Sequence, residues 1–203
     1  MSRLVENIDS YRRLLRHELP ASTRNSLEWL LLTAVRERAG LQSGRDTPKL
    51  RGPQLLNVAN AAVASAVSAQ QAQFGGLHLY IATHDVLVML ASRNFGSGFT
   101  HHFAFLRPDG RTPCSRALSS GRRVVIEDVA HDEAFEPLVP IARDAGWRSV
   151  QATPLKSSSG EIFAILSTHF EAPRAFSEDE LLAMDAHCRE LSAQLARAWG
   201  TRH

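Results

Sequence analysis

The chain has 203 residues, 44% of them hydrophobic, and a formal net charge of +2. A chain of this size can bury one sizeable core and one helical appendage, but hardly two full domains. Basic and acidic residues are interspersed, with no polybasic tail and no aromatic-rich RNA-binding segment, which argues against nucleic acid as a direct partner. The charged N-terminus lacks a signal-peptide core and a membrane span, so we expect a cytoplasmic protein without a membrane partner.

The N-terminal part of the chain predicts a helical hairpin. Apolar residues recur every three or four positions up to Pro20, and again between Asn25 and Gly40. A polar linker rich in helix breakers follows and ends at Gly52. We therefore expect an N-terminal helical extension with its linker over residues 1–52 and a main domain over 53–203.

The main domain opens with a predicted helix and a β-hairpin. Small apolar residues from Leu55 to Val67 form a stripe that can approach a sheet closely, and we expect Gly75 and Gly76 to end this helix. Residues 77–82 and 86–92 are typical of two paired strands.

The segment over residues 93–121 contains several glycines and predicts an irregular excursion over the sheet. We expect short helices in it over 101–106 and 114–118. Excursions of this kind commonly carry binding residues.

The second half of the domain predicts a strand over 123–128, a short helix over 137–145, and an antiparallel pair of strands over 148–155 and 161–170. Ser177 and Glu180 predict a capping box at the start of the last helix. This order of elements indicates an α+β fold with a central antiparallel sheet of five or six strands.

Four segments of the chain resemble the GAF family of small-molecule sensory domains, in particular those of bacterial histidine kinases. They read CSRAL at 114–118, GRRVVIEDVAHDEAF at 121–135, AGWRSVQATPLKSSSGEIFAILSTHF at 145–170 and FSEDELLAMDAHCRELSAQLARA at 176–198. The resemblance, from about Leu55 to Arg197, implies helices on both faces of the sheet, with a ligand cavity under the excursion on one face. It also implies a homodimer through the helices Leu55–Val67 and Leu181–Leu195, and a signalling protein as a further partner.

Several candidate ligand-binding residues lie on the predicted strand over 148–155. Alternation places Ser149, Gln151 and Thr153 on one face, which we expect to be the face of the cavity. Polar side chains covered by helices need partners, and a ligand or water can supply them. Alternatively, Gln151 and Thr153 bond neighbouring backbone groups.

The last strand offers Ser167 and His169, which share one face by alternation. His169 matches a histidine of the last-strand motif in phytochrome GAF modules, where that strand borders the chromophore, although a structural hydrogen bond is the alternative. The segment before AGWRS contains neither the Cys nor the His of the phytochrome pocket, so we expect no covalent bilin.

Other candidates come from segments that border the cavity in this family, namely Cys114, Arg116, Asp128 and Phe135. Arg116 can pair with an anionic ligand, or it can form a structural salt bridge with Asp128. The ligand and any cofactor stay unidentified at this point.

Catalysis has one candidate, because some GAF proteins reduce free methionine sulfoxide with cysteine nucleophiles. That chemistry needs a resolving thiol beside Cys114, and the other cysteine, Cys188, lies on the apolar seam of the last helix. Both cysteines also fit as small apolar core residues.

No catalytic triad or phosphate-binding loop occurs, and the adjacent His101 and His102 lack the spacing of a metal site. We therefore expect no catalytic residues and no metal, and keep three hypotheses: a ligand-binding sensor, a thiol reductase using Cys114, and a ligand-free dimerising adaptor.

Overall fold

The computed structural model describes residues 52–82 and 85–199. Its helices are α3 (Gly52–Gln70), α4 (Ser97–His102), α5 (Pro113–Ser120), α6 (Val139–Asp144) and α7 (Glu178–Trp199). Its strands are β1 (Phe74–Ile81), β2 (Val86–Arg93), β3 (Phe105–Leu106), β4 (Val124–Ile126), β5 (Ser149–Lys156) and β6 (Ile162–Phe170). Two short 3-10 helices, Val129–His131 and Glu136–Leu138, precede α6. The predicted hairpin within residues 1–52 lies outside the described residues.

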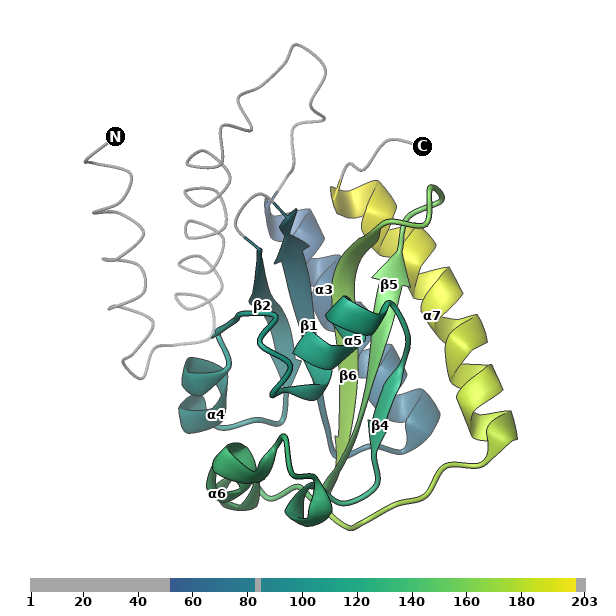
Figure 1. Ribbon diagram of the computed structural model, residues 1–203. Coiled ribbons are helices and arrows are strands. Elements are labelled where there is room, and N and C mark those ends of the chain that lie inside the picture. The colour runs from purple at the N-terminus through teal and green to yellow at the C-terminus, as the bar shows by residue number, and fades with distance from the viewer. Residues whose placement is uncertain (1–51, 83–84, 200–203) are drawn as a thin grey trace, which may run out of the picture.

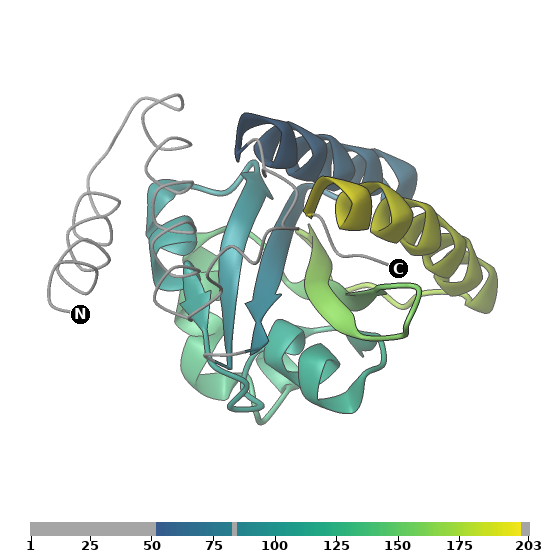
Figure 2. The ribbon, with the colours of Figure 1, turned by 90° about the horizontal axis from the view of Figure 1, so that it is seen from above.

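The six strands form one antiparallel sheet in the order β3-β2-β1-β6-β5-β4. Helices α3 and α7 lie side by side on one face, which we call the helix face, while α4, α5 and α6 cover the other, which we call the excursion face (Figures 1 and 2). The predicted α+β fold, with a six-stranded sheet and helices on both faces, is therefore confirmed.

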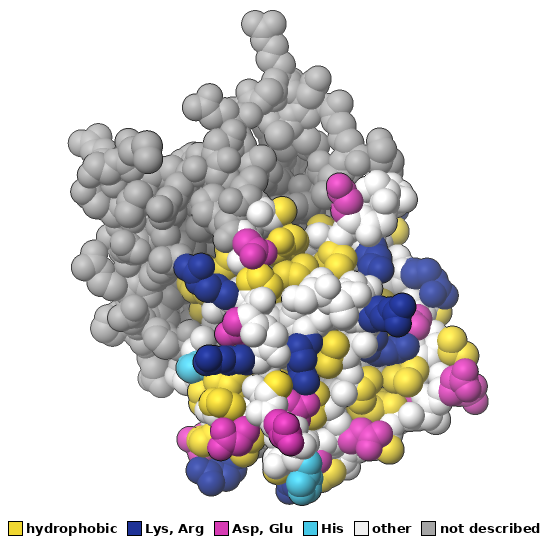
Figure 3. Space-filling model, in the orientation of Figure 1, with side chains coloured by type: hydrophobic (Ala, Val, Ile, Leu, Met, Phe, Trp, Pro, Cys, Tyr) yellow, Lys and Arg dark blue, Asp and Glu magenta, His cyan; other side chains and the backbone are white. Residues whose placement is uncertain are grey.

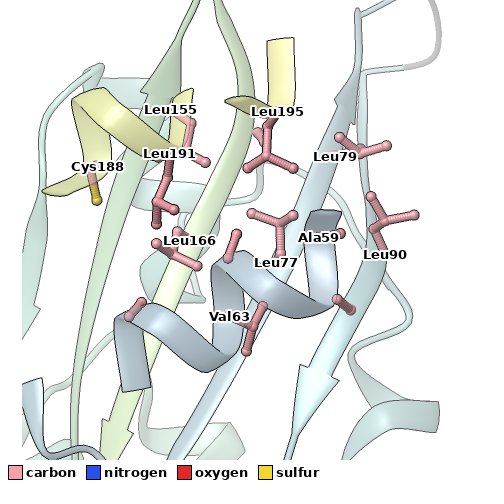
Figure 4. Close-up of a cluster of buried hydrophobic side chains, with 14 of the residues drawn as sticks. Ala59, Val63, Leu77, Leu79, Leu90, Leu155, Leu166, Cys188, Leu191 and Leu195 are labelled. Carbon is pink, nitrogen blue, oxygen red and sulfur yellow. The ribbon is translucent and has the colours of Figure 1, made fainter. Parts of the chain in front are cut away.

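The core on the helix face depends on the small residues of α3. Ala59, Ala62, Val63 and Ala66 are buried at helical spacing, and they pack with leucines of β1, β6 and α7 (Figure 4). A Cβ atom built on Gly75 in β1 would lie 2.6 Å from Val67 Cγ2. Glycine at this position thus allows α3 to lie directly on the sheet.

Two predicted boundaries are wrong. Gly75 and Gly76 do not end the first helix, since α3 already ends at Gln70 and both glycines lie within β1. The helix predicted over 101–106 lies earlier, as α4, because this register buries both Phe99 and Phe103 at i and i+4. Residues 105–106 instead form β3, which pairs with β2.

The second half of the domain follows its local signals. Strands β5 and β6 pair antiparallel, as predicted, across a turn with Gly160 at φ +86°. The predicted capping box is confirmed, because the Ser177 amide donates to Glu180 Oε2 over 2.8 Å and the Glu180 amide donates to Ser177 Oγ over 3.3 Å.

Arg174 joins three parts of the domain just before α7. Its backbone amide donates to Glu127 O, and its guanidinium donates to Gln70 O at the end of α3 and to Glu180 in the first turn of α7. The same guanidinium carbon lies 4.4 Å from the centre of the Phe170 ring. The end of α3 is thereby fastened to the start of α7.

Candidate functional site

The cavity predicted under the excursion is present but nearly closed. Its walls come from β1, β2, β6, α4, α5 and the segments around Phe135 and Trp147, and its open volume is about 20 Å³. A space of this size holds about one water molecule. This cavity is therefore too small for a ligand larger than water in this conformation.

Aromatic rings close the cavity. His169 lies edge-on to Trp147 with ring centres 4.5 Å apart, and to Phe95 and Phe99 at 5.0 Å and 5.9 Å. Phe99 also packs against Phe103, the next aromatic of the α4 segment, at 4.5 Å. Phe99 lies in the short helix α4 and Phe103 directly follows it, so displacement of α4 would enlarge the cavity.

Polar side chains of β1 and β6 lie beneath these aromatic rings. We call the rings and these side chains together the cage. His78 on β1 donates from Nε2 to the carbonyl oxygen of Phe103 over 2.9 Å, since a carbonyl can only accept. His169 Nε2 and Ser167 Oγ share a hydrogen bond of 3.1 Å, and Ser167 also donates to Gly76 O over 3.3 Å. These residues come from the adjacent strands β1 and β6, which the sheet holds in fixed register.

Both histidines are neutral near pH 7. Burial lowers the pKa of His78 to about 4, against a smaller opposing effect of its bond to Phe103. Burial also lowers the pKa of His169 to about 3, and repulsion from the His78 charge adds to this effect. Since Nε2 of His78 carries the proton, Nδ1 of this residue is a bare acceptor.

Three buried nitrogen atoms of the cage have no hydrogen-bond partner among the described residues. They are Nδ1 of His78, Nδ1 of His169 and Nε1 of Trp147. Buried polar groups are ordinarily paired, and each unpaired one costs about 1–3 kcal/mol. Three hydrogen-bonding atoms are therefore left unpaired in residues that line the cavity.

Four of the predicted site residues border this cavity: Cys114, Phe135, Ser167 and His169. The predicted pairing of Arg116 with Asp128 is wrong. Arg116 Nη1 lies 2.9 Å from Asp132 Oδ2, while Asp128 pairs with Arg148 and lies outside the cavity lining. The hydrogen bond from Arg148 lowers the pKa of Asp128 below its ordinary value.

The predicted orientation of Gln151 and Thr153 is also wrong. Val150 and Ala152 belong to the core under the excursion, so alternation turns Gln151 and Thr153 to the helix face. There Gln70 of α3 donates to Gln151 Oε1 over 3.5 Å, and Gln151 donates to Thr153 Oγ1 over 3.4 Å. Ser149, on the same side, donates to Ala172 O over 2.9 Å. A side chain of the covering helix takes the place that we assigned to a ligand.

Sequence reasoning missed His78 and Trp147. The signal for His78 was its place between Leu77 and Leu79 in a strand, where alternation sets it on the face opposite the leucines. No comparable signal pointed to Trp147, because this residue lies in an irregular segment between α6 and β5 where no periodicity applies.

The two cysteines lie on opposite faces of the sheet. Cys114 on α5 borders the cavity, and Cys188 on α7 packs in the core of the helix face. Burial raises the pKa of each thiol to about 12, with the Asp185 charge contributing at Cys188. Both are free thiols, and neither is in the thiolate form that nucleophilic attack requires near pH 7.

Two further properties concern residues 52–82 and 85–199. Within them, no group of three His, Cys, Asp or Glu side chains is arranged to hold a metal ion. None of the helices there combines the length and hydropathy that crossing a membrane requires.

Comparisons with known proteins agree with this architecture. The family pattern described as GAF domain matches residues 55–198. No curated protein sequence matches the chain.

Solved structures share the fold at low sequence identity. The GAF domain of an Acinetobacter phosphoenolpyruvate-protein phosphotransferase is 17% identical, with a TM-score of 0.59 over 71% of this chain and 83% of that one. Free methionine-R-sulfoxide reductase from Neisseria meningitidis, in complex with its substrate, is 21% identical, with a TM-score of 0.56 over 90% and 95%. The blue-light absorbing form of the PixJ GAF domain from Thermosynechococcus elongatus is 17% identical, with a TM-score of 0.55 over 70% and 85%. With the family pattern covering most of its length, the chain belongs to the GAF domain family.

Proposed function

We propose that the chain is a sensory module that binds a small polar molecule in the cavity under α4 and α5. The unpaired nitrogen atoms of His78, Trp147 and His169 carry this proposal, because these three residues line one cavity and no described residue bonds the atoms. A neutral ligand with a donor and an acceptor fits two neutral imidazoles and an indole N–H. A metal or covalent cofactor is not required.

Binding requires the cavity to grow. We infer that the ligand displaces α4, since Phe99 and Phe103 occupy the space over His169 and His78. A Cβ atom built on Gly96 or Gly98 meets no other atom within 4 Å, so these two glycines at the start of α4 are not packed on their Cβ side. The hydrogen bond from His78 to Phe103 O connects the cavity floor to this motion.

The output surface in this proposal is the pair of helices on the helix face. Leu77 and Leu79 flank His78 in β1 and belong to the core beneath α3 and α7. A shift of β1 would thus reach the segments Leu55–Val67 and Leu181–Leu195, through which we propose that two copies associate or a signalling protein docks.

Native mass spectrometry of the purified full-length protein tests the proposal. We expect a co-purified small molecule that is retained by Gln151→Leu, whose side chain faces the other side of the sheet, and lost from His78→Ala/His169→Ala. An empty wild-type protein that remains dimeric contradicts ligand sensing and supports the ligand-free adaptor, which the small volume of the cavity also favours.

A thiol reductase is the second candidate, favoured by the position of Cys114 in the cavity wall. It requires Cys188 to reach across the sheet, or an external thiol, to resolve the oxidised Cys114. An assay with free methionine sulfoxide decides this point. Reduction that is lost in Cys114→Ser, with both thiols accessible to titration, would establish the enzyme; we expect no reduction, because both thiols are buried and protonated.

A further inference from the structure

A second hollow lies at the outer edge of the sheet, away from the cavity under α4. It is a groove of about 810 Å³ between α7, the β5–β6 turn and the residues before β4. Its α7 wall is one continuous helical face, from Asp185 through Arg189 and Ser192 to Ala196. The volume lies in the range of small-molecule sites.

The groove carries an excess of positive charge. Its lining includes Arg122, Arg123, Lys156 and Arg189, against a single acidic residue, Asp185. Figure 3 shows Lys and Arg side chains gathered on the upper right, where Figure 1 places the β5–β6 turn and α7. Four cations against one carboxylate leave a local excess of +3, whereas the whole chain carries +2.

The one carboxylate is already engaged. Arg123 Nη2 lies 2.9 Å from Asp185 Oδ2, and the same guanidinium donates to Leu181 O, which fixes the groove wall to α7. Within the described part of the chain, Arg122, Lys156 and Arg189 form no salt bridge. These three cations therefore have capacity for an added anion.

The edge of the sheet restricts what can occupy the groove. β4 pairs with β5 only at residues 150–152, so the described strands leave Thr153–Lys156 without a partner on that side. Pro154 has no N–H to donate and Lys156 adds a charge, and both features oppose the addition of a peptide strand. Among the described residues that line the groove, none is aromatic and able to stack on a nucleobase. Hydroxyl groups of Thr153, Ser157 and Ser192 complete a surface of donors.

We propose that this groove binds a compact small molecule with two or more phosphate groups. Guanidinium and ammonium groups with neighbouring hydroxyls match phosphate oxygens, and the described lining offers no aromatic ring that would favour a nucleoside. This site is independent of the cavity under α4 and contacts α7 directly.

Calorimetric titration of the full-length protein with pyrophosphate at about 0.15 M ionic strength tests the proposal. We expect pyrophosphate to bind about tenfold more tightly than sulfate, and Lys156→Gln/Arg189→Gln to weaken it by about tenfold or more. The matched control is Arg143→Gln, an exposed arginine of α6 outside the groove, which should leave the affinity unchanged.

Equal affinity for pyrophosphate and sulfate, or equal loss in the control variant, would overturn the proposal. Binding of a glutamate-rich peptide or an oligonucleotide in place of pyrophosphate would do so too. Amide chemical-shift mapping on the wild-type protein provides a reading that does not depend on the folding of any variant. Shifts should concentrate at Gly121, Gly160 and Ser192, and shifts confined to the cavity around His169 would contradict the site.

Discussion

The two sides of strand β6 differ in how their polar groups are paired. Thr168 lies against α3, while its neighbours Ser167 and His169 border the cavity. On the helix face, Thr168 donates to Gln70, which in turn donates to Gln151. On the excursion face, the equally buried His169, His78 and Trp147 each keep a nitrogen atom without a partner. The polar groups of the helix face thus add stability through their hydrogen bonds, whereas the unpaired nitrogen atoms of the excursion face lower it.

The largest effect is expected from acid, because the two buried histidines lie on the excursion face only. The folded-state pKa values of His78 and His169, about 4 and about 3, lie below the unfolded value of 6.5. Below pH 6.5 the unfolded chain therefore binds more protons than the folded one, so the stability is complete above pH 6.5 and is lost as the pH falls through about 4 to about 3. From pH 7 to pH 5 we expect the free energy of unfolding to fall by about 3 kcal/mol, measured by urea denaturation.

The control for this pH dependence is His169→Leu, which removes one of the two histidines. We expect it to lose about half of the slope between pH 6.5 and pH 5. An unchanged slope would show that the buried histidines do not cause the loss.

A loss of stability nearly as large as that caused by acid is expected when a side chain is added to the tightly packed helix face. In Gly75→Ala the new methyl group would lie 2.6 Å from Val67 Cγ2 and 2.9 Å from Val63 Cγ1. We expect a loss of about 2 kcal/mol in the free energy of unfolding, because α3 must move off the sheet. Gly98→Ala is the matched control; its methyl group meets nothing within 4 Å, and it should stabilise the protein by up to about 1 kcal/mol. Equal effects of the two changes would refute the close approach.

A smaller loss of stability is expected when one member of the hydrogen-bonded network of Thr168, Gln70 and Gln151 is removed. Gln151→Leu leaves the Nε2 group of Gln70 buried without its acceptor, and we expect a loss of about 1.5 kcal/mol. Thr168→Val removes the other bond of Gln70 and should behave alike. Chemical denaturation of both variants tests this, and a gain in stability from either would show that the network does not stabilise the fold.

The smallest effect is expected on the excursion face. His169→Leu removes an imidazole with an unpaired nitrogen, so at pH 7 the stability should stay within about 1 kcal/mol of the wild type, with a gain favoured over a loss. Comparison of its denaturation midpoint with that of Gln151→Leu sharpens the contrast between the faces. A loss as large as that of Gln151→Leu would mean that His169 is structural.

Local signals predicted most of the fold. The pair β5 and β6 and the capping box at Ser177 follow from alternation, turn residues and capping chemistry, which act over a few positions. The position of α4 was predicted less well, because it depends on where Phe99 and Phe103 find a core.

The site was predicted in part, for a related reason. Alternation correctly separated Gln151 from Val150, but the periodicity of a strand does not say which of its faces lies under the excursion. The same holds for Arg116, whose partner Asp132 lies 16 positions along the chain and is selected by the packing of α5 rather than by any short motif.

Arg174 has a consequence for the signalling that we propose for this domain. One guanidinium bonds both Gln70 and Glu180, which fixes the end of α3 to the start of α7. A second contact, 3.1 Å between Ser65 Oγ and His187 Nε2, joins the two helices further along. In the function that we propose, a shift of β1 would then move α3 and α7 together instead of sliding one along the other. A partner docked across both helices would therefore be displaced by the pair as one surface.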